Sequence, residues 1–306
     1  MPTETAPELK MPSYGGQAVI EGVMMRGKKA VAMAVRSPQG EIVMFDEQLP
    51  ALYRSVWFRT PFVRGVLGLW DSLMLGMRYL TKAANVQTGE DEKIEGGTLV
   101  LTVLVAVVLG VGVFFLLPAL TAGWVDKALK LGSWWSNLFE GFLRLAILVA
   151  YMALVGKMPD IKRTFMYHGA EHKTINAFES GVELTPQNVA LQSKVHPRCG
   201  TSFILTLVIF SVLIFSILGP LPLYWRLISR VLLLPLVAGI AYEYIRWAAR
   251  AMDKSAFVRA IIAPNLLLQK LTTKEPTEDM LEVSIAAFNR MYALEHDTEQ
   301  AQPLSA

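Results

Sequence analysis

Two histidines and a glutamate with the spacing H-x-x-E-H lie near the middle of the chain, at His168, Glu171 and His172. If residues 162–180 form a helix, as we expect, the two imidazoles lie one turn apart on one face. They could bind one divalent transition metal, most simply zinc, while Glu171 deprotonates a water on the metal. The alternative is a polar helix face without a ligand, because the motif alone has low specificity.

A catalytic zinc usually has three protein ligands and one position for water, so a third ligand is needed. His196 and Glu243 are the first candidates and rank equally, since imidazole binds zinc well and a carboxylate at membrane depth is costly without a role. Arg246 could instead neutralise Glu243. Cys199 is the next candidate, or it is a small buried residue at the start of an apolar stretch.

Four other polar residues near these motifs have open interpretations. Glu179 shares the helix face of the histidines but lies roughly 10 Å beyond the second of them, too far for one ion on a straight helix. Lys173 and Arg198 could stabilise an anion near the metal, although surface charge is the simpler explanation for each. Glu21 lies in a glycine-rich run and is expected to be structural or solvent-facing.

Composition points to a membrane protein. Of the 306 residues, 53% are hydrophobic and only 18% are charged, and the mean hydropathy is +0.39. The net charge of +3 and the lack of basic–aromatic alternation give no indication of a nucleic-acid partner. A single cysteine excludes an intrachain disulfide and fits a reducing compartment. No phosphate-binding loop or dinucleotide fingerprint is present.

About four stretches are long and apolar enough to be transmembrane helices, with aromatic residues at their edges. They are residues 98–120, 134–156, 200–223 and 225–247. Four spans place both termini and the motif loop on one side, which also carries most lysines and arginines. The positive-inside rule therefore predicts a multi-pass membrane protein with cytoplasmic termini.

The remaining regions are expected to be cytosolic. Residues 15–49 should form strands, with a β-hairpin whose turn includes Pro38 and Gly40. An amphipathic helix within residues 50–85 lies in the membrane interface or packs on the protein's own core. The C-terminal part should contain one or two helices over 253–274, broken at Pro264, and another over 280–294. The predicted domains are 1–97, 98–250 with the motif loop 157–199, and 251–306.

Three segments together resemble the YqhQ-like family of bacterial membrane proteins (domain of unknown function 1385). They are GGQAVIEGVMMRG at 15–27, YHGAEHK at 167–173 and HPRCGTSF at 196–203. The resemblance extends from about residue 15 to residue 276. It implies an integral membrane protein and a metal-dependent enzyme, and it specifies no substrate.

The sequence thus predicts a polytopic α-helical membrane protein with a metal site at the cytoplasmic membrane surface. The expected activity is hydrolysis of a peptide, amide or lipid-linked bond, with the lipid bilayer as the main partner. The alternative is a scaffold, assembly factor or transporter with a structural metal ion or none. The apolar first and third spans disfavour a transporter, which should have polar residues along several spans.

Overall fold

The computed structural model describes residues 14–50, 55–58, 60–88, 97–130, 132–218, 221–252 and 254–300. Its N-terminal part is an antiparallel sheet in the order β1-β2-β3-β4. The strands are β1 (Gly15–Val19), β2 (Gly22–Arg26), β3 (Ala30–Arg36) and β4 (Ile42–Gln48). The expected hairpin is confirmed, since Arg36 pairs with Ile42 and Gly40 turns with a φ of +91°. The parts of the predicted N-terminal region at 1–13, 51–54 and 89–96 lie outside the described residues.

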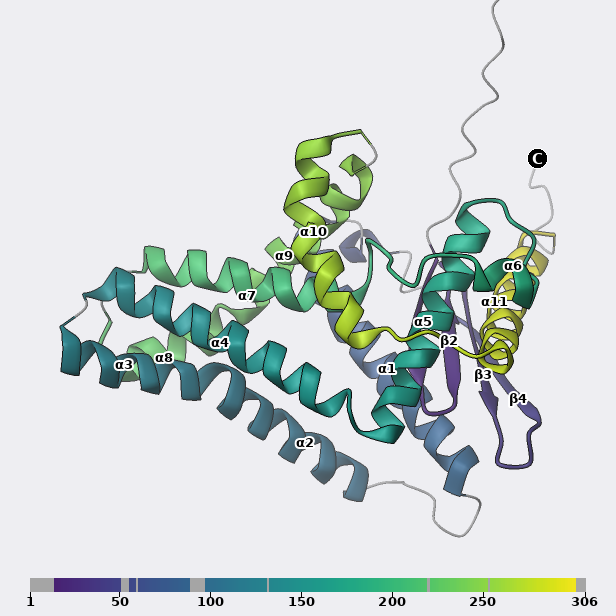
Figure 1. Cartoon of the computed structure of the whole chain (residues 1–306), viewed down its shortest axis with the longest axis horizontal. Coiled ribbons are helices and arrows are strands. Elements are labelled where there is room, and N and C mark those ends of the chain that lie inside the picture. Colours follow the sequence, from purple (N-terminus) through teal and green to yellow (C-terminus); the bar gives the residue numbers. More distant parts are fainter. Residues whose placement is uncertain are drawn as a thin grey trace, which may run out of the picture.

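Helices cover both faces of this sheet (Figure 1). The motif helix α5 (Pro159–Glu179) and the C-terminal helix α11 (Glu278–Gln300) pack on one face, and α1 (Val63–Thr88) packs on the other. Strand alternation sends Val23 and Met25 into the core under α5 and α11, and Met24 into the core under α1. Segments far apart in the sequence therefore share one folded unit around the sheet.

Most of the other helices form an elongated bundle that extends away from the sheet (Figure 1). They are α2 (Gly97–Val111), the π-helical stretch η3 (Gly112–Leu116), α3 (Leu117–Leu129), α4 (Ser133–Val155), α7 (Gly200–Ile217), α8 (Leu223–Leu232) and α9 (Leu234–Ala251). Helix α10 (Ala256–Thr272) runs across the end of the bundle nearest the sheet and packs on α7 and α4. Two short turns, η2 (Val56–Phe58) and α6 (Pro186–Ala190), precede α1 and follow α5.

Within the described residues, three helical stretches are long and apolar enough to cross a membrane. They are Val100–Leu129, Trp134–Val155 and Gly200–Ile217. The pair α8 and α9 is a fourth candidate but bends by 44°. The first candidate is longer than the sequence predicted, and the fourth is not one straight helix.

Prolines account for both differences. Pro118 follows the π-helical stretch, where the wider turn accommodates a residue without an N–H while the helix continues. Pro235 lies at the second position of α9, directly after the bend. Its ring cannot follow a regular helical turn without meeting the carbonyl of Val231, so the chain bends there.

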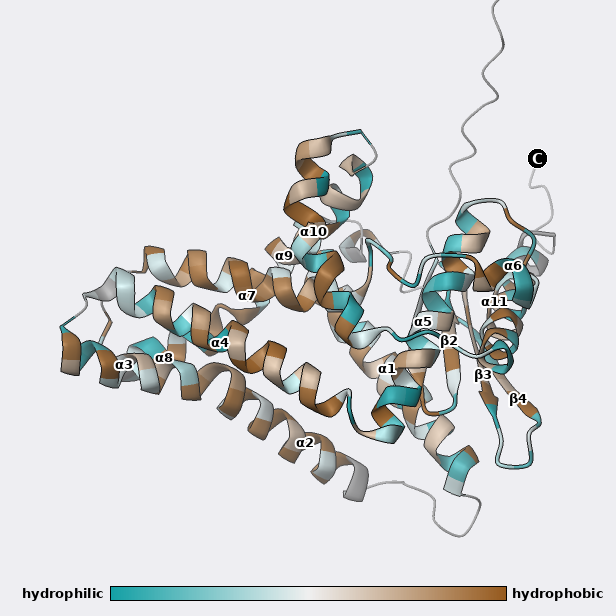
Figure 2. Cartoon of the chain, in the orientation of Figure 1, coloured by the Kyte–Doolittle hydropathy of each residue, from teal (hydrophilic) through white to brown (hydrophobic). Residues whose placement is uncertain are grey.

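The surface of the bundle is apolar. Figure 2 shows hydrophobic residues around α2 and along α7. On α2, Val100, Leu101, Leu104 and Val108 are each more than half exposed. Exposed apolar side chains in such numbers are rare on soluble monomers, so this surface suits lipid better than water.

The interpretation that the amphipathic helix packs on the protein's own core is confirmed for one part of α1. Leu75, Tyr79 and Ala83 pack against the sheet. Nearer the start of the helix, Trp70 and Leu73 are more than half exposed. One half of α1 therefore belongs to the protein core, and the other offers an apolar surface. Helix α10 runs through Pro264 without the predicted break.

Candidate metal centre

The H-x-x-E-H motif lies on a helix, as expected. Pro159 occupies the first turn of α5, where its missing N–H would have no helical acceptor, and Gly181 lies just beyond the end with a φ of +68°. The rings of His168 and His172 have centroids 4.4 Å apart. Glu171 and His172 are buried against neighbouring segments, so this face of α5 is not a solvated surface.

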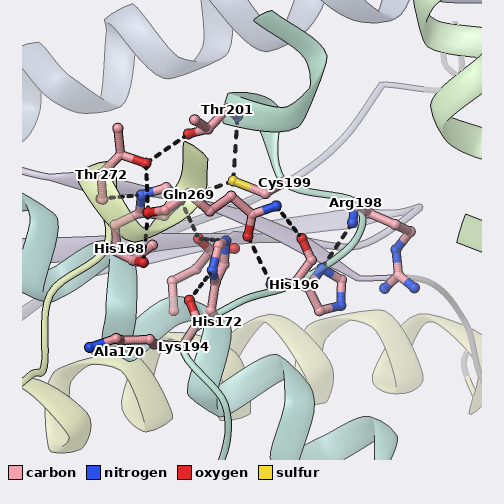
Figure 3. Close-up of polar contacts among 12 residues, drawn as sticks. His168, Ala170, His172, Lys194, His196, Arg198, Cys199, Thr201, Gln269 and Thr272 are labelled. Carbon is pink, nitrogen blue, oxygen red and sulfur yellow. Dashed lines mark hydrogen bonds and ion pairs between the residues drawn. The ribbon is translucent and has the colours of Figure 1, made fainter. Parts of the chain in front are cut away.

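His168 has the hydrogen bond that a metal-ligating histidine needs. Its Nδ1 lies 2.9 Å from the carbonyl oxygen of Thr272 (Figure 3). A carbonyl oxygen only accepts, so Nδ1 carries the proton and Nε2 keeps a free lone pair. That Nε2 lies 3.3 Å from Sγ of Cys199.

His172 repeats this arrangement with a different acceptor. Its Nδ1 lies 2.7 Å from the carbonyl oxygen of Lys194, in the loop that precedes α7. Nε2 is again the nitrogen with the lone pair. Hydrogen bonds from Nδ1 to backbone carbonyls are the usual way in which proteins orient histidine ligands of metal ions. Two independent histidines are therefore prepared to offer Nε2 to the same space.

Cys199 completes the group from the start of α7. It is the N-cap residue, and its Sγ accepts the backbone N–H of Thr201 at 3.4 Å. Negative charge is stabilised at a helix N-terminus, and a metal-bound cysteine is a thiolate. The position therefore suits a sulfur ligand.

Ligand atoms of His168, His172 and Cys199 all lie within 4.8 Å of one another. A tetrahedral zinc ion with bonds of about 2.1–2.3 Å holds its ligand atoms about 3.5 Å apart. If the three ligand atoms moved about 1 Å closer to one another, they could bind an ion of this kind. The donor types, nitrogen and sulfur, are those that zinc prefers.

Glu171 faces both histidines from a buried position. Its Oε2 lies 3.8 Å from Nε2 of His168 and 3.7 Å from Nε2 of His172. Burial raises the pKa of Glu171 to about 7, although His168 and the backbone N–H of Gly16 act in the opposite direction. A Cβ at Gly16 would lie 2.7 Å from Cγ of Glu171, so only glycine lets β1 approach the motif this closely.

These groups line a cavity of about 80 Å³ between α5, β1 and the start of α7. Tyr14, Ile175 and Gly200 also contribute to its wall. The space is large enough to hold water beside these groups.

His196 lines the same cavity, but its ring nitrogens have other partners. Nδ1 accepts the backbone N–H of Arg198 at 3.4 Å, which makes Nε2 the protonated nitrogen, and Nε2 lies 3.3 Å from Oε2 of Glu179. Arg198 also forms an ion pair with Glu179. His196 therefore has no lone pair directed at the cluster, and it belongs to a neighbouring ion-pair group.

Glu243, the other first candidate, is bound elsewhere. Its Oε1 accepts from Nε of Arg64 at 2.7 Å and from the backbone N–H of Phe62 at 3.2 Å. The ion pair with Arg64 ties α9 to the start of α1. The alternative that an arginine neutralises Glu243 is therefore supported, with Arg64 rather than Arg246 as the ion-pair partner, and this carboxylate has a structural role.

Glu243→Gln should leave the metal content of the purified protein unchanged, because the carboxylate is outside the cluster. The unfolding free energy should fall by about 1 kcal/mol, as is usual when a partly exposed ion pair is lost. Elemental analysis and a thermal melt measure the two effects. Loss of metal from a folded Glu243→Gln variant would restore Glu243 as a ligand candidate.

Lys173 also has a structural role. Its Nζ donates to the carbonyl oxygen of Ala190 at 2.6 Å and pairs with Glu275 at 2.6 Å. It thus links α5 both to the end of α6 and to the segment after α10. Glu21 is structural, as expected, because both its oxygens bind Arg163.

Several residues that shape the site were not recognised in the sequence. Thr272 and Lys194 contribute only carbonyl oxygens, which every residue has, so no sequence signal exists for them. Gln269 does have a signal, since it is a polar residue on the buried face of α10. Its amide bonds the backbone N–H and C=O of His196 and the Oγ of Ser202, and so fixes the loop that carries Cys199.

The fold and site define a class: a helical protein whose described residues include three or four helices apolar enough to cross a membrane, joined to a small sheet domain, with a His/His/Cys group where the two meet. The chain belongs to the family described as "Protein of unknown function (DUF1385)", whose profile matches residues 60–294. The expected family is therefore confirmed.

The chain is also 35% identical over 308 residues to "Uncharacterized protein YqhQ" of Bacillus subtilis (strain 168). That alignment covers 95% of this chain and 96% of the relative. No solved structure matches the chain.

Proposed function

We propose that this protein is a membrane-embedded, metal-dependent hydrolase with its site at the cytoplasmic surface of the bacterial inner membrane. One observation carries the proposal. Two Nε2 lone pairs and one sulfur converge, and a buried carboxylate oxygen lies 3.7–3.8 Å from both nitrogens. On a polar helix face without a ligand, these four groups would not be expected to point toward one another.

The donor set fits zinc. His168, His172 and Cys199 would hold the ion and leave one position open, as in catalytic zinc sites with three protein ligands. A zinc ion in such a site supplies a water of lowered pKa and polarises a carbonyl.

The chain's own groups would direct this chemistry. The backbone N–H of Gly16 orients Glu171, and Glu171 takes the proton from the attacking water as general base and returns it to the leaving group. Thr272 and Lys194 keep the two histidines in the tautomer that binds.

The membrane part of the proposal is supported by the apolar helices and by their arrangement. The sheet domain lies at one end of the bundle, next to the last turns of α4 and the start of α7 (Figure 1). The exposed aromatic residues Trp57, in η2, and Trp70, in the first half of α1, suit the lipid–water interface. A site in this position favours a peptide, amide or lipid-linked bond presented at the membrane surface.

Glu171→Gln tests the catalytic role. The variant keeps all three proposed ligands, so it should retain about one metal ion per chain while losing about 10²–10⁴-fold in rate, the usual contribution of a general base. Because the proposal names a class of bonds and not one substrate, the assay incubates the protein in nanodiscs with native membrane extract in H₂¹⁸O. Each hydrolysis leaves one ¹⁸O in a product, which mass spectrometry detects.

Products labelled equally by the wild type and by Glu171→Gln would contradict the proposal. Loss of metal in a folded Glu171→Gln variant would instead make Glu171 a ligand. Cys199→Ala is the comparison variant: it should lose both metal and labelled products, since it removes a proposed ligand and leaves the base in place.

The second candidate is a non-enzymatic scaffold, assembly factor or transporter with a structural ion. The small cavity of about 80 Å³ favours it, because a hydrolase must also admit its substrate. In this case Glu171→Gln would retain metal and fold, and no ¹⁸O-labelled product would depend on Glu171.

A further inference from the structure

A second group of charged residues is buried in the helical bundle, away from the sheet. Glu140 and Arg144 lie on α4, and Arg226 and Arg230 lie on α8. Glu140 lies two turns from the start of α4, and the α3–α4 turn is at the end of the bundle remote from the sheet (Figure 1). The side chains of Glu140, Arg144 and Arg230 are each at most 2% exposed.

One carboxylate accepts hydrogen bonds from three arginines. Oε1 of Glu140 accepts from Nη2 of Arg144 at 2.8 Å and from Nε of Arg230 at 2.9 Å. Oε2 accepts from Nη2 of Arg226 at 2.8 Å and from Nη2 of Arg230 at 3.0 Å. The acceptor capacity of Glu140 is therefore filled, and the four residues together carry a net charge of +2 (three positive, one negative).

Apart from Glu140, the groups that accept hydrogen bonds from Arg144 and Arg230 are neutral. Arg144 donates to the carbonyl oxygen of Phe114 and to Oγ of Ser211, and Arg230 donates to Oδ1 of Asn137. Helix α7, which packs on α4, has no charged residue. On α3, the Oδ1 of Asp126 accepts the backbone N–H of Gly132 in the α3–α4 turn.

A buried excess of positive charge is unfavourable unless an anion compensates it, because arginine does not lose its proton in proteins. The excess also lies at the end of the bundle where the positive-inside rule leads us to expect few basic residues, given the orientation proposed above. An anionic ligand would compensate the buried positive charge, and it would account for basic residues at this end of the bundle.

We propose that this cluster binds a phosphate group, with Arg226 as the point of entry. The Arg226 side chain is 12% exposed, and within the described part of the chain no acceptor bonds its Nη1. The arginine fork binds phosphate oxygens in pairs. The phosphate can come from an anionic lipid headgroup or from a soluble phosphate. Exposed Tyr224 and Trp225, next to Arg226, suit the headgroup level of a bilayer.

The test uses the full-length protein in detergent. Native mass spectrometry measures retention of phosphatidylglycerol against phosphatidylcholine, and thermal shift measures binding of inorganic phosphate. Arg226→Gln should weaken binding of the phosphate compound about tenfold or more, as expected for loss of a charged hydrogen-bonding pair. Arg226→Lys, which keeps the charge but loses the fork, should show a smaller loss.

Arg250→Gln is the matched control, since Arg250 is an exposed arginine on α9 outside the cluster. Selective retention of phosphatidylglycerol that Arg226→Gln weakens supports a lipid ligand. A phosphate-dependent thermal shift with the same dependence supports a soluble ligand. The proposal fails if folded Arg226→Gln and Arg226→Lys bind both compounds as the wild type does, or if the wild type binds neither.

Discussion

Replacing His172 with alanine is expected to remove the bound metal from the purified protein. His172 is 2% exposed, and its Nε2 is one of the three converging ligand atoms. Loss of an outer hydrogen bond to a metal ligand costs about 10–100-fold in affinity, and loss of the ligand itself should cost more. Elemental analysis after dialysis should find close to one zinc per chain in the wild type and almost none in His172→Ala.

Two further variants separate this effect from loss of the fold. His172→Asn places an amide N–H near the position of Nδ1, where it can still donate to the carbonyl oxygen of Lys194, but it offers no Nε2. It should fold and lack metal. His296→Ala should retain metal, since His296 stacks on Tyr292 outside the cluster. Wild-type metal content in both His172 variants would contradict the proposed site.

Replacing Gly169 with alanine should have the second large effect, although Gly169 has no side chain to contribute. A Cβ at this position would overlap the backbone carbonyl oxygen of Lys274. The backbone there is held by a hydrogen bond from the N–H of Lys274 to the carbonyl oxygen of Phe165 at 2.8 Å. The segment after α10 would have to move away from α5, at a cost of about 1–3 kcal/mol, which is typical of overpacking.

The same movement should weaken metal binding, because the segment follows directly on Thr272, the last residue of α10, whose carbonyl oxygen orients His168. We expect Gly169→Ala to lower the unfolding midpoint and to reduce zinc affinity about 10–100-fold, as for other outer-shell losses. Chemical unfolding and a competitive zinc titration measure the two quantities.

Gly68→Ala on α1 is the matched control. Apart from the backbone of α1 itself, no atom of the described residues lies within 4 Å of a Cβ built at Gly68, and alanine is about 1 kcal/mol better than glycine inside a helix. This variant should be neutral or slightly stabilising and should bind zinc normally. Equal stability and zinc affinity for Gly169→Ala and the wild type would show that the close contact at Lys274 does not support the site.

The predicted fold was largely right because it depends on local patterns. Two runs on either side of a turn with Pro38 and Gly40 predicted the β3–β4 hairpin, and long apolar runs predicted the candidate spans. The details that failed depend on what a helix can accommodate. The chain bends before Pro235, which is the second residue of α9, whereas α10 continues through Pro264 inside the helix.

The sequence by itself determined the pair of histidines and the adjacent carboxylate, because helical spacing of three and four residues places their side chains together on any α-helix. It ranked His196 and Glu243 ahead of Cys199 as the third ligand, whereas the structure groups Cys199 with the two histidines, because long-range packing decides which of these residues lies near the motif. In the tertiary structure, Glu243 pairs with Arg64, and His196 contacts Glu179. Cys199, at the start of α7, lies beside His168.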